Sequence, residues 1–131
     1  MILLDTHVWI NWIIKGNAGL SPAIVNAMYK EDCLAVSAIS CFEVSLLAKR
    51  GKLELPLPVC EWLVEALGRS GVNALPVTCV IADRAVMLPD IHRDPADRII
   101  IATALIHDMK LASMDSIFPD YREIAMQLVG Y

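Results

Sequence analysis

Short apolar runs that alternate with helix-like segments are the feature that most constrains the fold of this chain. Strand-like runs lie at residues 1–5, 34–37, 73–77 and 111–114, with a weaker run at 126–129. Segments with the helical spacing of apolar residues lie between them, at 6–15, from 22 onward, and at 40–50, 59–69, 79–88 and 94–108. Alternating strands and helices build parallel sheets with helices on both faces. The sequence therefore predicts an α/β fold, a three-layer α/β/α sandwich around a central parallel sheet of about five strands.

Polar residues mark where the later helices begin. Asp94 precedes Pro95, which is typical of an N-cap followed by proline at the first helical position. Ser40 stands three residues before Glu43, as in a capping box, and predicts that the central helix starts at Ser40.

The composition indicates one domain over residues 1–131. Apolar residues make up 56% of the chain and the mean hydropathy is +0.53, yet no uninterrupted apolar run approaches the ~18 residues that span a bilayer. The first residues lack the basic region of a signal peptide, so we expect a cytoplasmic protein without membrane contact. The excess apolarity is explained by strands buried on both faces. Trp9, Trp12, Ile13 and Trp62 either complete this core or offer a surface to a partner.

Cysteine spacing and net charge exclude some classes of site. Cys33, Cys41, Cys60 and Cys79 include no Cys-x-x-Cys pair, so zinc and a disulfide framework have little support. We expect four small, buried, reduced thiols. The net charge of −4 argues against broad attraction to nucleic acid or anionic membranes. A nucleic acid that docks through a metal ion and a local basic strip is still compatible with it.

Four carboxylates fall at corresponding ends of the expected elements. Asp5 ends the first apolar run, Asp115 follows the run at 111–114, and Glu43 and Asp97 fall in the first turns of expected helices. Strand ends and helix starts meet at one edge of a parallel sheet, which is where ligands bind. Clustered carboxylates repel one another, so a shared cleft implies a bound cation. An all-oxygen site suits Mg²⁺ or Mn²⁺ far better than zinc.

Each acid also has a purely structural explanation. Glu43 fits the capping box, and Asp97 suits the positive end of a helix dipole. Asp5 and Asp115 are reasonable turn residues after strands. The joint placement of all four at one end of their elements favours a single site, and an unpaired carboxylate at Asp5 would be costly to bury.

Four segments together resemble PIN-domain nucleases, and within them the VapC-type toxins of prokaryotic toxin–antitoxin pairs. They are Leu-Leu-Asp-Thr-His-Val-Trp at 3–9, Ser-Ala-Ile-Ser-Cys-Phe-Glu-Val at 37–44, Arg-Asp-Pro-Ala-Asp-Arg-Ile-Ile-Ile-Ala-Thr-Ala at 93–104 and Leu-Ala-Ser-Met-Asp at 111–115. The Asp-Pro-Ala-Asp-Arg block before an apolar helix is the most specific of them. The resemblance extends over essentially the whole chain.

The resemblance implies a Mg²⁺-dependent endoribonuclease, with Mn²⁺ as an alternative metal. Asp5 and Asp97 would bind the metal directly, while Glu43 and Asp115 would complete the acidic pocket directly or through water. The implied partners are an RNA substrate, a small antitoxin protein and a second copy of the chain in a homodimer.

The resemblance also extends to residues beside the acids. Thr6 and Ser113 match hydroxyl positions of the family pattern, whereas Met114 departs from it and is expected to affect only the pocket wall. His7 and His92 are plausible at the rim of the pocket, although a structural or surface role is the simpler explanation. Metal-bound hydroxide can replace a side-chain base.

Substrate contact would be made by basic residues near the cleft. Lys49, Arg50 and Lys52 form the densest cluster, and they fit equally well as the solvated end of a helix that favours cations. Arg93 and Arg98 flank the acidic block and are expected to touch the substrate or a partner.

Two other functions are compatible with the sequence. A response-regulator receiver is a non-catalytic signalling module that also gathers acids around Mg²⁺. It needs an acidic pair after its first strand and a lysine after its fifth, whereas Asp5 is followed here by Thr6 and His7. The second rival is a PIN domain that binds RNA or protein without cutting, against which the complete set of four acids argues.

Overall fold

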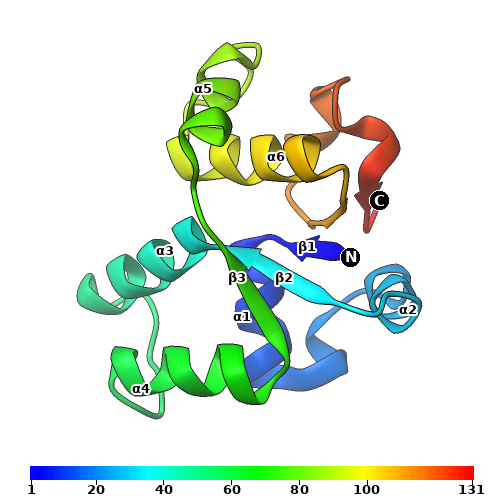
Figure 1. Cartoon of the computed structure of the whole chain (residues 1–131). Helices are drawn as coiled ribbons and strands as arrows, with labels where there is room; N and C mark the ends of the chain where they lie inside the picture. Colours follow the sequence, from blue (N-terminus) through cyan, green and yellow to red (C-terminus); the bar gives the residue numbers. More distant parts are fainter.

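The computed structural model describes residues 1–131 and is built around a five-stranded parallel sheet (Figure 1). The strands are β1 (Ile2–Leu4), β2 (Leu34–Ser37), β3 (Val72–Leu75), β4 (Lys110–Ala112) and β5 (Leu128–Val129). Their order in the sheet is β3-β2-β1-β4-β5, so that β1 lies at the centre. All pairs are parallel, and Leu3 of β1 is in register with Ala35 of β2 and Leu111 of β4. The predicted three-layer α/β/α fold is confirmed.

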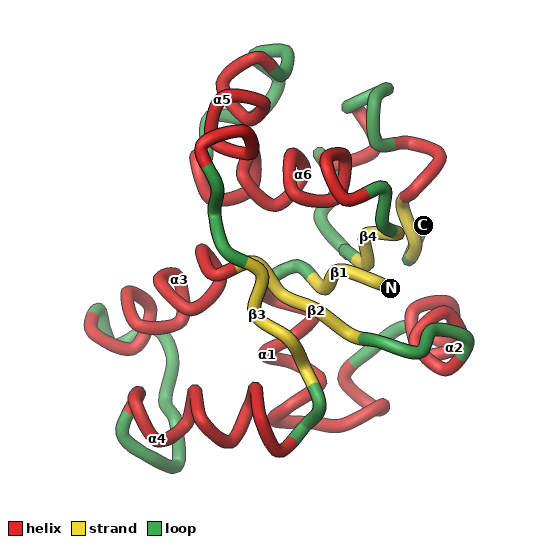
Figure 2. Tube along the Cα trace, in the orientation of Figure 1, coloured by secondary structure: helices red, strands yellow, loops and turns green.

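Six α-helices connect and cover these strands (Figure 2). They are α1 (Thr6–Lys15), α2 (Pro22–Tyr29), α3 (Ala38–Lys49), α4 (Val59–Val64), α5 (Cys79–Met87) and α6 (Pro95–His107). A π-helical turn, Glu65–Arg69, continues α4, and short 3-10 turns lie at Gly16–Gly19, Phe118–Asp120 and Ala125–Gln127. The helix predicted at 6–15 and the strand predicted at 34–37 have the bounds expected from the sequence. The last strand is shorter than expected and comprises only two residues.

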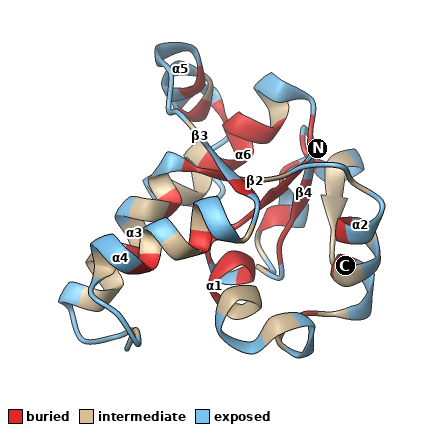
Figure 3. Cartoon of the chain, turned by 60° about the horizontal axis from the view of Figure 1, so that its bottom comes forward, coloured by how far each residue is buried: buried red, intermediate tan, exposed pale blue.

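The core has two parts because alternate strand residues point to opposite faces of the sheet. Ile2 and Leu4 belong to the larger cluster, with residues of α1, α2 and α4. Leu3 belongs to the second cluster, with Ile100 and Ile101 of α6. Figure 1 shows α5 and α6 on one side of the sheet and α1 and α4 on the other. Figure 3 shows that buried residues concentrate in the sheet and on the helix faces turned towards it.

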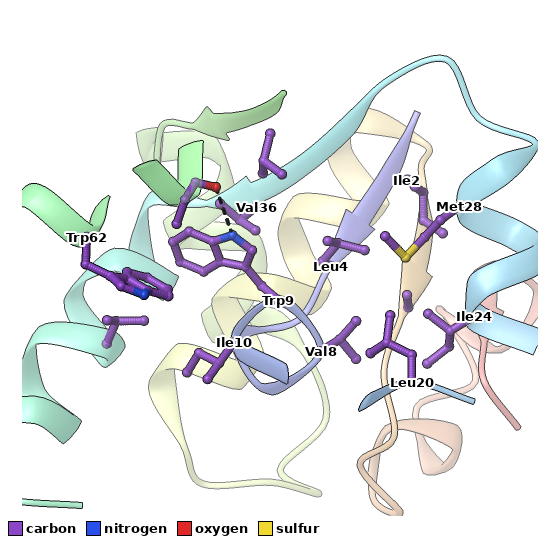
Figure 4. Close-up of a cluster of buried hydrophobic side chains, with 14 residues drawn as sticks. Ile2, Leu4, Val8, Trp9, Ile10, Leu20, Ile24, Met28, Val36 and Trp62 are labelled. Carbon is purple, nitrogen blue, oxygen red and sulfur yellow. Dashed lines mark hydrogen bonds between the residues drawn. The ribbon is translucent and has the colours of Figure 1, made fainter. Parts of the chain in front are cut away.

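Two tryptophans complete the larger cluster (Figure 4). The rings of Trp9 and Trp62 have centroids 5.3 Å apart and planes tilted by 58°. The indole N–H of Trp9 also donates to the carbonyl oxygen of Ala66. Trp12 and Ile13 are half-buried against the same cluster. Trp9 and Trp62 therefore serve the core, whereas Trp12 and Ile13 are only half-buried against it, and a partner contact by these two stays a prediction.

The start of α3 differs from the sequence prediction. The helix begins at Ala38, and its N-cap is Ser37, whose hydroxyl accepts from the backbone N–H of Ile39. The capping box predicted at Ser40 and Glu43 is therefore wrong. The physical reason is that β2 passes into α3 without a loop, so the last strand residue itself caps the helix. Glu43 consequently lies in the second helical turn and its carboxylate is free for another contact.

The prediction of buried cysteines is also wrong. Cys33, Cys60 and Cys79 are exposed, and Cys41 is half-buried. The three exposed residues stand just before β2 or at the starts of α4 and α5, where the chain is at the surface. All four thiols are free, as expected. No helix has both the length and the apolar character that crossing a membrane requires.

Candidate active site

Asp5 is a buried carboxylate at the carboxyl end of the central strand. It is the N-cap of α1, and one of its oxygens accepts the backbone N–H of Val8 at 3.0 Å. The other oxygen accepts the hydroxyl of Ser113, which directly follows β4. Only 5% of Asp5 is exposed, and burial raises the pKa of its carboxyl despite these hydrogen bonds and the nearby His7. The carboxylate is thus held in one orientation, but the chain supplies no Lys or Arg side chain to pair with it.

Glu43 is tied to the residue that follows Asp5. The Thr6 hydroxyl lies between the Glu43 carboxylate and the hydroxyl of Ser40, which is 2.8 Å away. A hydroxyl has one proton to donate, so donation from Thr6 to Glu43 and from Ser40 to Thr6 satisfies all three groups. Burial raises the pKa of Glu43, and the carboxylates of Asp94 and Asp5 act in the same direction.

Asp97 forms the third part of the site with His92 and Asp94. The Nε2 atom of His92 lies 2.6 Å from a carboxylate oxygen of Asp97. Asp94 is the N-cap of α6, as predicted, and accepts the backbone N–H of Ala96 at 2.9 Å. One ligand atom from each of His92, Asp94 and Asp97 lies within 4.8 Å of the others. Burial, followed by the charges of Asp94 and Glu43, raises the pKa of Asp97 to about 7.

These carboxylates make one electrostatic unit. Asp94 and Glu43 act on Asp97, while Asp94 and Asp5 act on Glu43, so three separate segments meet. Each segment starts at the carboxyl edge of the sheet or at a helix start beside it, as expected for parallel strands. The set offers carboxylate and hydroxyl oxygens with one imidazole, which are donors suited to a hard divalent cation. A buried Asp5 carboxyl without a Lys or Arg partner fits such an ion, because a bound cation would favour its charged form.

Asp115 joins this set through Ser113. Its backbone N–H donates to the Ser113 hydroxyl at 3.0 Å, and that same hydroxyl is bonded to Asp5. The Asp115 side chain accepts the backbone N–H of Ile117 at 2.8 Å, so it also stabilises the turn after β4. Asp115 therefore stabilises the turn after β4 and is linked to Asp5 through one shared hydroxyl, while a part in metal binding stays a prediction.

Two residues have a larger part in the site than the sequence predicted. Asp94 was expected only as a helix cap, and His92 was expected more as a structural or surface residue than as part of the site. The spacing His-x-Asp-x-x-Asp at 92–97 is the pattern that could have predicted this. Asp94 and Asp97 are three residues apart at a helix start, which places them on the same side. His92 is also fixed by its backbone, since its N–H donates to the hydroxyl of the buried Tyr121 at 2.8 Å.

The family of this chain follows from its similarity to known proteins. Residues 2–124 match the family described as PIN domain. The chain belongs to the PIN-domain family. This PIN domain is 39% identical over 115 residues to "Ribonuclease VapC22" of Mycobacterium tuberculosis, in an alignment covering 87% of the chain and 86% of that relative. The family resemblance expected from the sequence is confirmed.

Solved structures show the same fold. One is a toxin–antitoxin complex from Klebsiella pneumoniae, with a TM-score of 0.66, 21% identity and 94% of each chain covered. Another is VapBC2 from Rickettsia felis bound to a DNA fragment from its promoter, with a TM-score of 0.68 and 15% identity, covering 98% of this chain and 97% of that one. At these identities the likeness concerns the fold.

The arginine after the acidic block has a structural task in this PIN domain. The Arg98 side chain is only 11% exposed. Its guanidinium donates, at 2.7–3.2 Å, to five backbone carbonyls, those of Ala85, Val86, Leu88, Pro89 and His92. It therefore fixes the end of α5 and the loop carrying His92. The expected contact of Arg98 with substrate or a partner finds no support in this geometry, because its donors are already used.

The other predicted basic residues lie at the surface. Arg93 is exposed and borders a hollow of about 710 Å³ between α5 and the start of α6. Lys49, Arg50 and Lys52 are exposed around the end of α3. A substrate contact by these four side chains stays a prediction.

Proposed function

We propose that this PIN domain is a divalent-metal-dependent endoribonuclease that acts as the toxin of a toxin–antitoxin pair. The observation that carries the proposal is the convergence of Asp5, Glu43 and Asp97 at the carboxyl edge of the sheet, with no Lys or Arg side chain to neutralise them. The name of the 39% identical relative supports ribonuclease activity. The oxygen-rich donor set favours Mg²⁺, with Mn²⁺ as the alternative.

The carboxylates that would bind the metal are already held in place in the metal-free protein. Asp5 and Asp97 are the proposed direct ligands, and Glu43 and Asp115 act directly or through water. A bound ion would polarise the scissile phosphate and lower the pKa of a coordinated water. Fixed ligands matter because an ordered site loses less entropy when the ion binds.

Neighbouring side chains supply that order. The hydroxyl of Ser113 holds Asp5, the hydroxyl of Thr6 holds Glu43, and the imidazole of His92 holds Asp97. These hydrogen bonds fix the tilt of each carboxylate. Supporting partners of this kind commonly change metal affinity 10- to 100-fold when they are removed.

The partner is proposed to be a small antitoxin, because the structures with this fold include toxin–antitoxin complexes. A cationic side chain of the antitoxin would compete with the metal for Asp5 and Asp97. Adding the antitoxin should therefore block cleavage and lower Mg²⁺ affinity together. If metal affinity and nuclease rate were both untouched by a bound antitoxin, this competition would be disproved. A homodimer is also proposed, and light scattering of the purified protein tests it.

The test of the catalytic assignment compares three purified variants on single-stranded RNA. Asp5→Asn and Asp97→Asn should lose cleavage in Mg²⁺ while keeping the circular dichroism of the wild type. Asp83→Asn is the matched control, because Asp83 is an exposed acid on α5. Chelation with EDTA should stop the wild type, and excess Mg²⁺ should restore it. Full activity of Asp5→Asn or Asp97→Asn would refute the site, whereas RNA binding by the wild type without cleavage would favour the non-catalytic PIN rival.

A further inference from the structure

A glycine after β5 allows the chain to pass close to the acidic site. Gly130 has a φ of 116°, a conformation that residues with side chains rarely adopt. A Cβ atom there would lie 2.4 Å from the carbonyl oxygen of Ser113 and 3.0 Å from a side-chain carbon of Ile24. The backbone N–H of Ser113 also donates to the carbonyl of Val129 at 3.2 Å. Residues 129–130 are therefore packed against the strand end that carries Ser113.

This close approach brings Tyr131 to the rim of the acidic site. Its phenol hydroxyl donates to the backbone carbonyl of Asp115. Burial raises the pKa of Tyr131, and the carboxylates of Asp5 and Asp115 act in the same direction, while the Ser113 hydroxyl acts in the opposite direction. The residue is nevertheless 57% exposed. Its hydroxyl end is thus tethered beside the acids, while the residue as a whole is more than half exposed.

Two other roles fit the geometry less well. The phenol proton is already donated to a carbonyl, so it is poorly placed to protonate a leaving group. Asp115 is already fixed by bonds from Ser113 and to Ile117, so it needs no further support. What Tyr131 adds is a flat, neutral surface beside a cluster of negative charge. Such a surface can bind a nucleobase where the acids repel phosphates.

We propose that the Tyr131 ring is a stacking platform for one base of the RNA, next to the phosphate that is cleaved. The inference rests on the proposed ribonuclease function and extends it to a substrate-binding residue. The tether to Asp115 orders the ring in advance, so less entropy is lost when a base stacks on it. Every base has a π face, so this contact adds affinity with little sequence preference.

The experiment measures cleavage of a short single-stranded RNA by the full chain carrying Tyr131→Ala, Tyr131→Leu or Tyr131→Phe. Stacking on an aromatic side chain predicts that Tyr131→Ala and Tyr131→Leu raise KM about 5- to 150-fold with kcat nearly unchanged. Tyr131→Phe keeps the ring and should stay within about threefold of the wild type. Tyr29→Ala is the control, because Tyr29 is 78% exposed at the end of α2, before the chain enters the amino end of β2.

A second arm locates the stacked base. An RNA with a single abasic nucleotide, moved along the sequence, should be a poor substrate of the wild type when the gap falls at the stacked position. Tyr131→Ala should show no additional loss at that same position, because the contact is already gone. Additive losses at every position would overturn the inference.

The remaining outcomes separate this inference from the function beneath it. If kcat and Mg²⁺ affinity both fell, and fell as far in Tyr131→Phe as in Tyr131→Ala, Tyr131 would be a positioning residue and the stacking role would be overturned. An unchanged KM in Tyr131→Leu, in a protein that melts like the wild type and cleaves RNA, would overturn the inference alone. A wild type that neither binds nor cleaves RNA would overturn the proposed function and the inference with it.

Discussion

Raising the pH should destabilise the metal-free protein. The carboxyl of Asp97 has an ordinary pKa of 3.8 and a folded-state pKa of about 7. Between these values the folded protein keeps a proton that the unfolded chain releases. The stability gained from this proton is therefore complete below pH 3.8 and is lost as the pH rises through 7. The raised pKa values of Asp5 and Glu43 act in the same direction.

The size of the effect follows from the same pair of values. A pKa that rises from 3.8 to about 7 corresponds to at most about 4 kcal/mol of unfolding free energy. The Asp97 side chain is 19% exposed and lies against His92, so solvent screening and the imidazole reduce the loss to about 2 kcal/mol. About three-fifths of that loss, or about 1.2 kcal/mol, falls between pH 5 and pH 8, because the rest is already lost between pH 3.8 and pH 5. For a domain of this size, that lowers Tm by about 3–5 °C.

Thermal unfolding in EDTA, followed by circular dichroism from pH 5 to pH 8, measures this loss. Asp97→Asn should flatten the profile and melt above the wild type at pH 8, whereas Asp83→Asn should keep the wild-type slope. Mg²⁺ should raise the wild-type Tm more at pH 8 than at pH 5, because the ion replaces the proton. The reasoning is refuted if the metal-free wild type melts equally at both pH values, or if Asp97→Asn keeps the full slope.

Three further substitutions test how the site is held in place. Arg98→Ala should lower the free energy of unfolding in urea by about 3 kcal/mol, because several charge-assisted hydrogen bonds are lost. Arg69→Ala removes one exposed ion pair and should lower it by under about 0.5 kcal/mol, so equal losses would contradict the structural task of Arg98. Gly130→Ala should cost about 2–3 kcal/mol, and Gly51→Ala, with φ of 70° in open space, about 1 kcal/mol; a reversed order would disprove the close approach at residue 130. Ser37→Ala should cost about 1 kcal/mol in the same assay, and a neutral result would mean that Ser37 does not cap α3.

Elements with strong local signals were predictable from the sequence. The helix at Thr6–Lys15 has apolar residues at helical spacing, and Asp94 caps its helix as expected from the following proline. The start of α3 was not predictable in this way, because Ser37 and Ser40 are both good N-caps. Only the direct junction of β2 with α3 selects Ser37.

Contacts between distant segments account for what the sequence could not provide. The acids were expected to meet because strand ends and helix starts share an edge, and the structure brings Glu43 within electrostatic range of both Asp5 and Asp97. The five carbonyl bonds of Arg98 depend on how the loop after α5 returns to α6, which no local pattern encodes. Tyr131 was missed because its position depends on the packing of a two-residue strand.

The uneven distribution of tryptophan makes the two halves of the core spectroscopically different. Trp9, Trp12 and Trp62 all lie with the cluster on the α1 and α4 side of the sheet, and the α6 side contains none. Intrinsic fluorescence therefore reports the loosening of one layer, whereas far-ultraviolet circular dichroism averages over both. Coincident transitions by the two probes would indicate that the sheet couples the layers into one cooperative unit. Fluorescence changing first would identify the α1 and α4 layer as the one that opens first, with the acid-bearing start of α6 still in place.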